Sequence, residues 1–170
     1  MQRIAKFEKV SFRQFSAAWQ KYDPAAGEEE VRRIYDRIQL PKRATKGSAG
    51  YDFYAPVTVT MAPGEEKLIP TGIRAKISDG FVLILVPRSS LGFRYRMQLD
   101  NTVGVIDADY YEADNEGHIM CKLFNDTREN KTLEIEAGKG MVQGIFLPFG
   151  ITEDDEADSQ RTGGFGSTTK

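Results

Sequence analysis

Cysteine and histidine are almost absent from this chain of 170 residues, which contains one residue of each. A single cysteine, Cys121, excludes an intrachain disulfide. A single histidine, His118, excludes a metal site built from several histidines, and it leaves only that residue for a Ser-His-Asp triad. His118 follows Gly117 in a pattern typical of a hairpin turn, so we expect it at the surface.

A strong charge of one sign and long apolar runs are absent too. The formal net charge of −2 gives no general attraction to nucleic acid or to an anionic membrane. No apolar run approaches the roughly 18 residues of a membrane span, and the first residues, MQRIAKFEKV, lack the apolar core of a signal peptide. We therefore expect a cytoplasmic protein with one folded domain, in which a few placed cations bind any phosphate.

Residues 11–38 have the pattern of two helices. Ser11 and Gln14 have the spacing of a capping box. Apolar side chains follow at helical spacing, at positions 12, 15 and 19 and then at positions 31, 34, 35 and 38. Proline and glycine interrupt the pattern between the two helices, and three glutamates at 28–30 suit the first turn of the second.

Beyond residue 41 the pattern changes to short strands. Residues 57–61 alternate between apolar side chains and threonine, and residues 81–86, FVLILV, are apolar throughout, as in a strand covered on both faces. Further strands are expected at 3–10, 68–69, 103–106, 119–124 and 141–149, with turn dipeptides at 63–64 and 79–80. This spacing predicts an all-β sandwich, barrel or jelly roll.

The end of the chain differs in composition from the rest. Residues 152–158 are acidic, and the remainder is mostly Gly, Ser and Thr, so we expect a domain at 1–158 and a flexible arm at 159–170. The arm's GGFGST resembles a phosphate cradle but lacks the flanking elements of a P-loop. Phe165 could cover a flat ligand, and Arg161 could pair with a phosphate. By composition alone, a linker without a binding role is the commoner explanation.

Two further stretches place polar side chains after apolar strands. Residues 87–92, PRSSLG, offer an arginine, serine hydroxyls and turn N–H groups to an anion, although they also fit a polar β-turn. Asp107 and Asp109 follow residues 104–106 at alternate positions and share one face of an extended chain. A carboxylate there acts as a general base on water or pins a turn. Tyr110 adds a flat ring and a hydroxyl.

Together and in this order, these stretches resemble the motifs of the trimeric dUTPase family. The first motif matches residues 48–55, SAGYDFYA, and the preceding 40–45 strengthen it. The later four match residues 87–92, 101–110, 140–145 and 161–168. The resemblance therefore extends over most of the chain from residue 40, and its third motif is the most specific.

The resemblance implies an all-β fold, a jelly roll of the β-clip type with an added N-terminal helix pair, which assembles as a homotrimer. Three sites shared between subunits would hydrolyse dUTP to dUMP and pyrophosphate. Asp107 would be the catalytic residue that activates the water attacking the α-phosphorus. Mg²⁺ would be held by the triphosphate and by water, without a direct protein ligand.

The resemblance also assigns the substrate-binding residues. Tyr110 would pack under the deoxyribose and exclude UTP, while Asn101 and Met120 would lie in the β-hairpin that reads uracil. The phosphate turn would contain Arg88, Ser89 and Ser90. Gln143 would contact a phosphate or water, and the closing arm would contribute Arg161, Phe165, Gly166 and Ser167, with the ring on uracil.

The chain departs from the family pattern at several places. The second motif usually has glycine where Ser90 stands, and the fifth motif is one residue shorter than usual between Arg161 and Phe165. Extra residues, 112–116, lengthen the hairpin after Tyr110, and the helices at 11–38 have no counterpart. We expect those helices on the outside of the fold or at a subunit contact.

Two rival functions follow from the same fold. A dCTP deaminase would have its catalytic glutamate three residues before Asn125, where this chain has Lys122, and a lysine cannot replace a proton-shuttling glutamate. A nucleotide sensor or regulatory protein would instead bind a partner protein through the added helices or the long hairpin.

Overall fold

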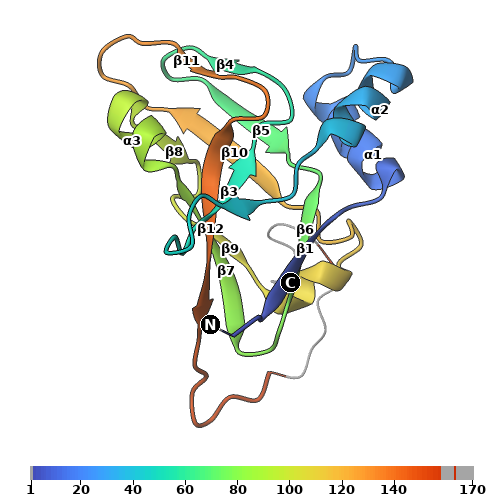
Figure 1. The fold of residues 1–170 in the computed structure, drawn as a ribbon, viewed down its shortest axis with the longest axis vertical. Coiled ribbons are helices and arrows are strands. Elements are labelled where there is room, and N and C mark those ends of the chain that lie inside the picture. The colour runs from blue at the N-terminus through green and yellow to red at the C-terminus, as the bar shows by residue number, and fades with distance from the viewer. Residues whose placement is uncertain (1, 158–162, 164–170) are drawn as a thin grey trace.

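The computed structural model describes residues 2–157 and residue 163, and within them the chain is mostly β-strand. Figure 1 shows the strands as crossing layers, with two helices together at one side. All the strand pairs in these residues are antiparallel, as expected for a jelly roll. The all-β prediction is confirmed.

The largest sheet has five strands, in the order β2-β3-β12-β7-β9. These strands are β2 (Lys42–Arg43), β3 (Tyr51–Tyr54), β12 (Gly140–Pro148), β7 (Phe81–Pro87) and β9 (Gly104–Ile106). Leu83 and Leu85 of β7 are buried, whereas their neighbours along the strand are half-buried. The prediction that β7 is covered on both faces is therefore wrong for the single chain, because only one face packs on the core.

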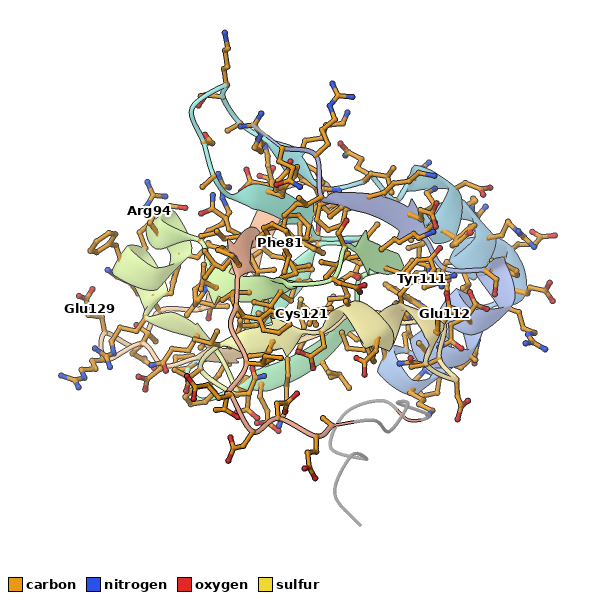
Figure 2. All side chains as sticks on the ribbon, turned by 90° about the horizontal axis from the view of Figure 1, so that it is seen from below. Phe81, Arg94, Tyr111, Glu112, Cys121 and Glu129 are labelled. Atoms are coloured by element: carbon orange, nitrogen blue, oxygen red, sulfur yellow. The ribbon has the colours of Figure 1, made fainter. Side chains whose placement is uncertain are left out.

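Three smaller sheets complete the β structure of the described residues. One has the order β5-β10-β8, and the other two pair β1 with β6 and β11 with β4. Their bounds are β1 (Ala5–Lys9), β4 (Val59–Met61), β5 (Glu66–Pro70), β6 (Ile73–Ile77), β8 (Met97–Leu99), β10 (Met120–Asn125) and β11 (Leu133–Ile135). Figure 2 shows Cys121 of β10 in the interior, while Arg94 and Glu129 point outward at the rim.

Residues 11–38 form helices α1 (Phe12–Tyr22) and α2 (Glu28–Arg37). The Ser11 hydroxyl caps α1 by accepting the Gln14 backbone N–H at 3.1 Å. Phe15 and Trp19 are fully buried, and α1 packs against β5. Gly72 permits this packing because a Cβ there would lie 2.3 Å from Cδ1 of Ile38, which follows α2.

Two short helices were not predicted from the sequence. Residues read as a polar turn form α3 (Ser89–Tyr95), and the stretch after Asp107 forms the 3-10 helix η1 (Ala108–Glu112). Leu91 and Tyr95, one helical turn apart, pack against the core and explain why α3 forms. None of the helices in residues 2–157 is long and apolar enough to cross a membrane.

Candidate active site

Asn101 and Met120, predicted to read a base, lie together in one pocket. Its volume is about 330 Å³, within the range of small-molecule sites. Asn101 lies in the turn after β8, and Met120 begins β10. Backbone and side chains of β9 complete one wall, and the full lining is Leu68, Leu85, Leu99, Asp100, Asn101, Gly104, Val105, Ile106, Met120 and Lys122.

Asp107 and Tyr110 lie directly after the strand that lines this pocket. Asp107 is the N-terminal cap of η1 and has an extended backbone. Tyr110 is buried, and its hydroxyl donates to the His118 carbonyl at 2.8 Å and accepts from Asn115 Nδ2 at 2.7 Å. These contacts fix the Tyr110 ring, which is buried three residues along the chain from Asp107.

Lys122 lies in the same pocket with two acidic neighbours. Its Nζ is 2.8 Å from Asp100 Oδ2 and 2.8 Å from Glu66 Oε1. The hydrogen bond to Asp100, and after it the hydrogen bond to Glu66, raises the pKa of Lys122 above its usual value. A lysine held in its charged form cannot accept a proton at neutral pH, so Lys122 cannot serve as the base that deamination requires.

A second group of predicted residues surrounds Asp52 in β3. Asp52 is 8% exposed, and its Oδ1 accepts Gln143 Nε2 at 3.0 Å and pairs with Arg88 Nε at 3.2 Å. The strand register sets Gln143 opposite Asp52 and Val86, so β12 brings the end of β7 to the first motif. Asp52 thereby orients one arginine and one amide, whose remaining N–H groups suit an anion.

A glycine allows this arrangement. A Cβ on Gly140 would lie 2.9 Å from Arg88 Cδ, and the Gly140 carbonyl accepts an Arg88 N–H at 3.5 Å. Ser89 and Ser90 follow Arg88 and are exposed in the first turn of α3. N–H groups in a first helical turn have no acceptor within the helix and point outward. The structure therefore places a guanidinium, two hydroxyls and outward N–H groups together.

The two groups lie far apart within one chain. In the pairing of β7 with β9, Ile106 is opposite Leu83, so continuing the register sets Asp107 opposite Val82. Arg88 directly follows β7 and is six residues beyond Val82, which corresponds to about 20 Å at the rise of an antiparallel strand. One chain thus separates the backbone at the predicted base from the backbone at the predicted phosphate turn by about 20 Å along the sheet.

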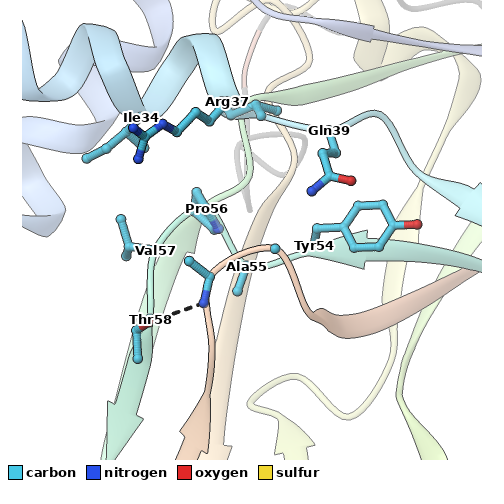
Figure 3. A pocket seen from close by; sticks show the side chains of 11 residues that line it. Ile34, Arg37, Gln39, Tyr54, Ala55, Pro56, Val57 and Thr58 are labelled. Carbon is cyan, nitrogen blue, oxygen red and sulfur yellow. Dashed lines mark hydrogen bonds between the residues drawn. The ribbon is translucent and has the colours of Figure 1, made fainter.

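Two larger pockets are lined by none of the predicted catalytic or substrate-binding residues that the structure describes. One, of about 570 Å³, lies between α2, the end of β3 and the turn before β12, and is lined by Ile34, Arg37, Tyr54 and Pro56 among others. Figure 3 shows its labelled side chains and the hydrogen bond from the Ala137 N–H to Thr58 Oγ1, at 3.2 Å. The other, of about 920 Å³, is lined by Arg3, Arg43 and Lys46 together with aromatic side chains.

Sequence reasoning missed one member of the site and misplaced another residue. Asp52 lies within the first motif, and only strand pairing shows its position between two polar partners. The prediction that His118 lies at the surface is wrong, because the residue is fully buried. In the interior, the Gly72 N–H donates to its Nε2 at 2.8 Å. Arg161, Phe165, Gly166 and Ser167 lie outside the described residues.

Known proteins similar to this chain point to one family. The dUTPase family profile matches residues 36–169. The deoxyuridine 5'-triphosphate nucleotidohydrolase of Lactococcus lactis is 50% identical over 134 residues, covering 77% of this chain and 88% of the relative. That of Tolumonas auensis is 40% identical over 144 residues, covering 80% of this chain and 91% of the relative.

Solved structures agree in fold. The crystal structure of dUTPase from Streptococcus mutans matches with a TM-score of 0.63 at 34% identity, covering 86% of this chain and 98% of that one. The dUTPase from phage phi11 of S. aureus has the same fold at 19% identity, with a TM-score of 0.63 over 92% of this chain and 97% of that one. The family match, extending over most of the chain and including both residue groups, shows that this chain belongs to the dUTPase family.

Proposed function

We propose that the protein hydrolyses dUTP to dUMP and pyrophosphate, with Asp107 as the general base. One observation carries the proposal beyond the family match: strand β9 lines the base-sized pocket and runs directly into Asp107. Asp107 accepts a proton from a water that attacks the α-phosphorus. The bond from that phosphorus to the bridging oxygen breaks, and pyrophosphate leaves.

The pocket is suited to a pyrimidine. Asn101 supplies an amide at the pocket, Met120 gives an adaptable apolar surface, and β9 and β10 supply backbone groups. A narrow pocket of this kind rejects a base with an added methyl by overlap, and it rejects one with the wrong hydrogen-bonding pattern by leaving polar groups unpaired. Tyr110, fixed through its hydroxyl, packs under the sugar and leaves no room for a 2′-hydroxyl.

The phosphates bind to the second group of residues. Arg88 supplies positive charge, Ser89 and Ser90 supply hydroxyls and N–H groups, and Gln143 supplies an amide. Phosphoryl transfer depends mainly on positioning and charge neutralisation. Asp52 is the residue that orients Arg88 and Gln143 for this purpose, and both lie within hydrogen-bonding distance of its Oδ1.

Mg²⁺ is the proposed cofactor and accompanies the triphosphate. No cluster of three or more His, Cys, Asp or Glu side chains that could hold a metal is found in residues 2–157. A magnesium ion usually keeps several waters and binds through substrate phosphates. This fits a site in which the residues proposed to bind the phosphates include the cation Arg88. When bound, the ion neutralises the charge that develops on the phosphate oxygens.

We further propose a homotrimer in which different subunits supply the two residue groups. The separation of about 20 Å along β7 supports a site that a second copy completes. An apolar surface is available for the contact: Val82 pairs with Leu147 and Ile84 pairs with Val105, and Val105 is 57% exposed. Such a patch on a sheet face marks an interaction surface.

Residues 159–170 complete this proposal as an arm that follows one folded domain at 1–158. Arg161, Gly166 and Ser167 contact the phosphates and Phe165 covers the uracil, closing the site against bulk water. Deleting residues 160–170 is expected to abolish turnover while leaving the trimer intact. A truncated trimer with full activity would refute the role of the arm.

The decisive test compares pyrophosphate release from dUTP, UTP, dTTP and dCTP with Mg²⁺ for wild type and Asp107→Asn. The wild type is expected to release pyrophosphate from dUTP alone. The variant should retain dUTP binding and lose most turnover, by about 10²-fold or more. Full turnover by the variant would exclude Asp107 as the base.

The same experiment separates the enzyme from the regulatory alternative. A nucleotide sensor that binds a partner protein would bind dUTP in both forms and release no pyrophosphate from either.

Residence in the cytoplasm is also proposed, and it fits a single thiol, Cys121, buried in the core.

A further inference from the structure

The long loop after Tyr110 joins the proposed sugar site to the added helix pair. We propose that Glu116 is a positioning residue through which α1 holds Tyr110 in place, so that the added helix pair sets the selectivity for deoxyribonucleotides over ribonucleotides. The proposal rests on the function proposed above, and it gives a part in that function's specificity to α1, which lies outside the region that matches the family, residues 36–169.

Glu116 binds the N-terminus of α1 through both carboxylate oxygens. The Ser11 N–H donates to Oε2 at 2.7 Å, and the Ser11 hydroxyl donates to Oε1 at 2.6 Å. In a capping box, the side chain of Gln14 would accept the Ser11 backbone N–H. Here Glu116, 105 positions away in sequence, accepts it instead. A two-point, charge-assisted contact of this kind fixes direction as well as distance.

The backbone at Glu116 requires such a restraint. Glu116 has φ 57°, a left-handed conformation that residues with a side chain rarely adopt. Gly117 follows with φ 67°, and a Cβ there would lie 2.6 Å from the Tyr110 carbonyl oxygen. Unfavourable backbone conformations persist where the surroundings hold them, and here the contact with Ser11 supplies that hold.

The residues on either side of Glu116 are those that hold the Tyr110 hydroxyl. Asn115 Nδ2 donates to this hydroxyl at 2.7 Å, and the hydroxyl donates to the His118 carbonyl at 2.8 Å. The His118 ring lies beside Phe15 of α1, with ring centroids 6.2 Å apart. These contacts link α1 to Tyr110 through residues 115–118, which include Glu116.

The neighbouring charges favour an ionised Glu116. Partial burial raises its pKa, but the hydrogen bonds from Ser11 and the nearby Arg74 and Arg13 outweigh that effect, and the pKa lies below its usual value. The carboxylate is therefore charged at neutral pH and accepts both hydrogen bonds. Next in the chain after Tyr110, Tyr111 anchors the start of the loop (Figure 2): Arg74 donates to its carbonyl at 2.6 Å.

The test measures the ratio of kcat/KM for dUTP to kcat/KM for UTP in wild type, Glu116→Ala and Glu112→Ala. This ratio does not depend on how much of the enzyme is folded, because both substrates meet the same active fraction. Glu116→Ala should lower the ratio by roughly tenfold or more, since small misplacements of a positioned group have effects of this size. Glu112, exposed at the end of η1, is the matched control and should leave the ratio unchanged.

Two further results separate the possible failures. If Glu116→Ala does not fold, Ser11→Ala removes the hydroxyl contact with Glu116 and the cap on the Gln14 N–H but keeps the contact from the Ser11 backbone N–H, and it should lower the ratio by a smaller factor. An unchanged ratio in Glu116→Ala, whatever its stability, overturns the positioning role while leaving dUTP hydrolysis in place. A wild type that does not turn over dUTP contradicts the proposed function itself.

Discussion

His118 gives the clearest link between one buried residue and pH. Burial lowers its pKa to about 4, and the Glu116 charge opposes this only in part. Its Nε2 accepts the Gly72 N–H, so the ring is neutral in the folded protein. In the unfolded chain the ring has its ordinary pKa of 6.5, which means that the unfolded state gains a proton first as the pH falls.

We therefore expect folding stability to decrease as the pH falls from about 6.5 to about 4. The full effect is roughly 3 kcal/mol, present above the unfolded pKa and lost as the pH approaches the folded one. Urea unfolding at pH 7, 6 and 5 measures this loss of stability. The neighbouring Glu116 does not interfere in this range, because its pKa is lowered from the usual value of 4.5. In His118→Gln, the slope of the free energy of unfolding against pH should decrease by the contribution of about one proton. An unchanged slope in that variant would contradict the assignment to His118.

Gly140 provides a second prediction for a single residue. A Cβ at this position would meet the flexible Arg88 side chain rather than backbone, so Gly140→Ala should move Arg88 from Asp52 with a stability change within about 0.5 kcal/mol. The kcat/KM for dUTP should fall by about tenfold as one charge-assisted contact is lost. Gly47→Ala is the control, since a Cβ there meets nothing within 4 Å.

At the scale of the elements, the helix pair is an integral part of the core. Phe15 is 0% exposed and contacts Trp19, Tyr35 and His118. Its burial joins α1, α2 and the loop that holds Tyr110. Apolar periodicity in the sequence was enough to predict both helices, but their partners in the β domain came from the structure.

Phe15→Ala should therefore destabilise the protein by about 3–5 kcal/mol, the usual cost of emptying a large core site. Phe93→Ala removes the same atoms from α3, where the ring is 88% exposed, and should change stability by less than about 0.5 kcal/mol. Denaturant midpoints of the two variants check this. Similar losses in both would mean that α1 does not pack as described, and Phe15→Leu offers a milder change if the alanine variant does not fold.

At the scale of the whole molecule, the separation between Asp107 and Arg88 makes a prediction about mixed subunits. Asp107→Asn and Arg88→Ala should each be inactive alone. In a mixed trimer whose sites combine Asp107 of one subunit with Arg88 of the next, one site always keeps both residues. Refolding an equal mixture should therefore restore roughly a quarter of the wild-type activity.

The controls for this experiment are the wild type and each variant refolded separately. Mass measurement of differently tagged subunits establishes that the trimers have mixed. Mixed trimers without activity would show that each site lies within one chain, and the separation along β7 would then need another explanation.

Much of the fold was predictable because local patterns specify it. The alternation at 57–61, the apolar run at 81–86 and the helical spacing at 11–38 each became the expected type of element. Of the strands that escaped prediction, β3 and β6 have four and five residues, and β2, β8 and β11 have two or three. Segments this short carry too little periodicity to be recognised, and they are strands only because a neighbour pairs with them.

The sequence by itself determined the all-β class, the helix pair and the motifs that identify the family, because periodicity and motif spacing are local along the chain. Only the tertiary structure decided that Asp52 orients Arg88 and Gln143, that His118 is buried, and that Glu116 caps α1. These facts depend on strand register and on contacts between residues up to 105 positions apart. Such contacts form when the chain closes its core, and no short stretch of sequence specifies them.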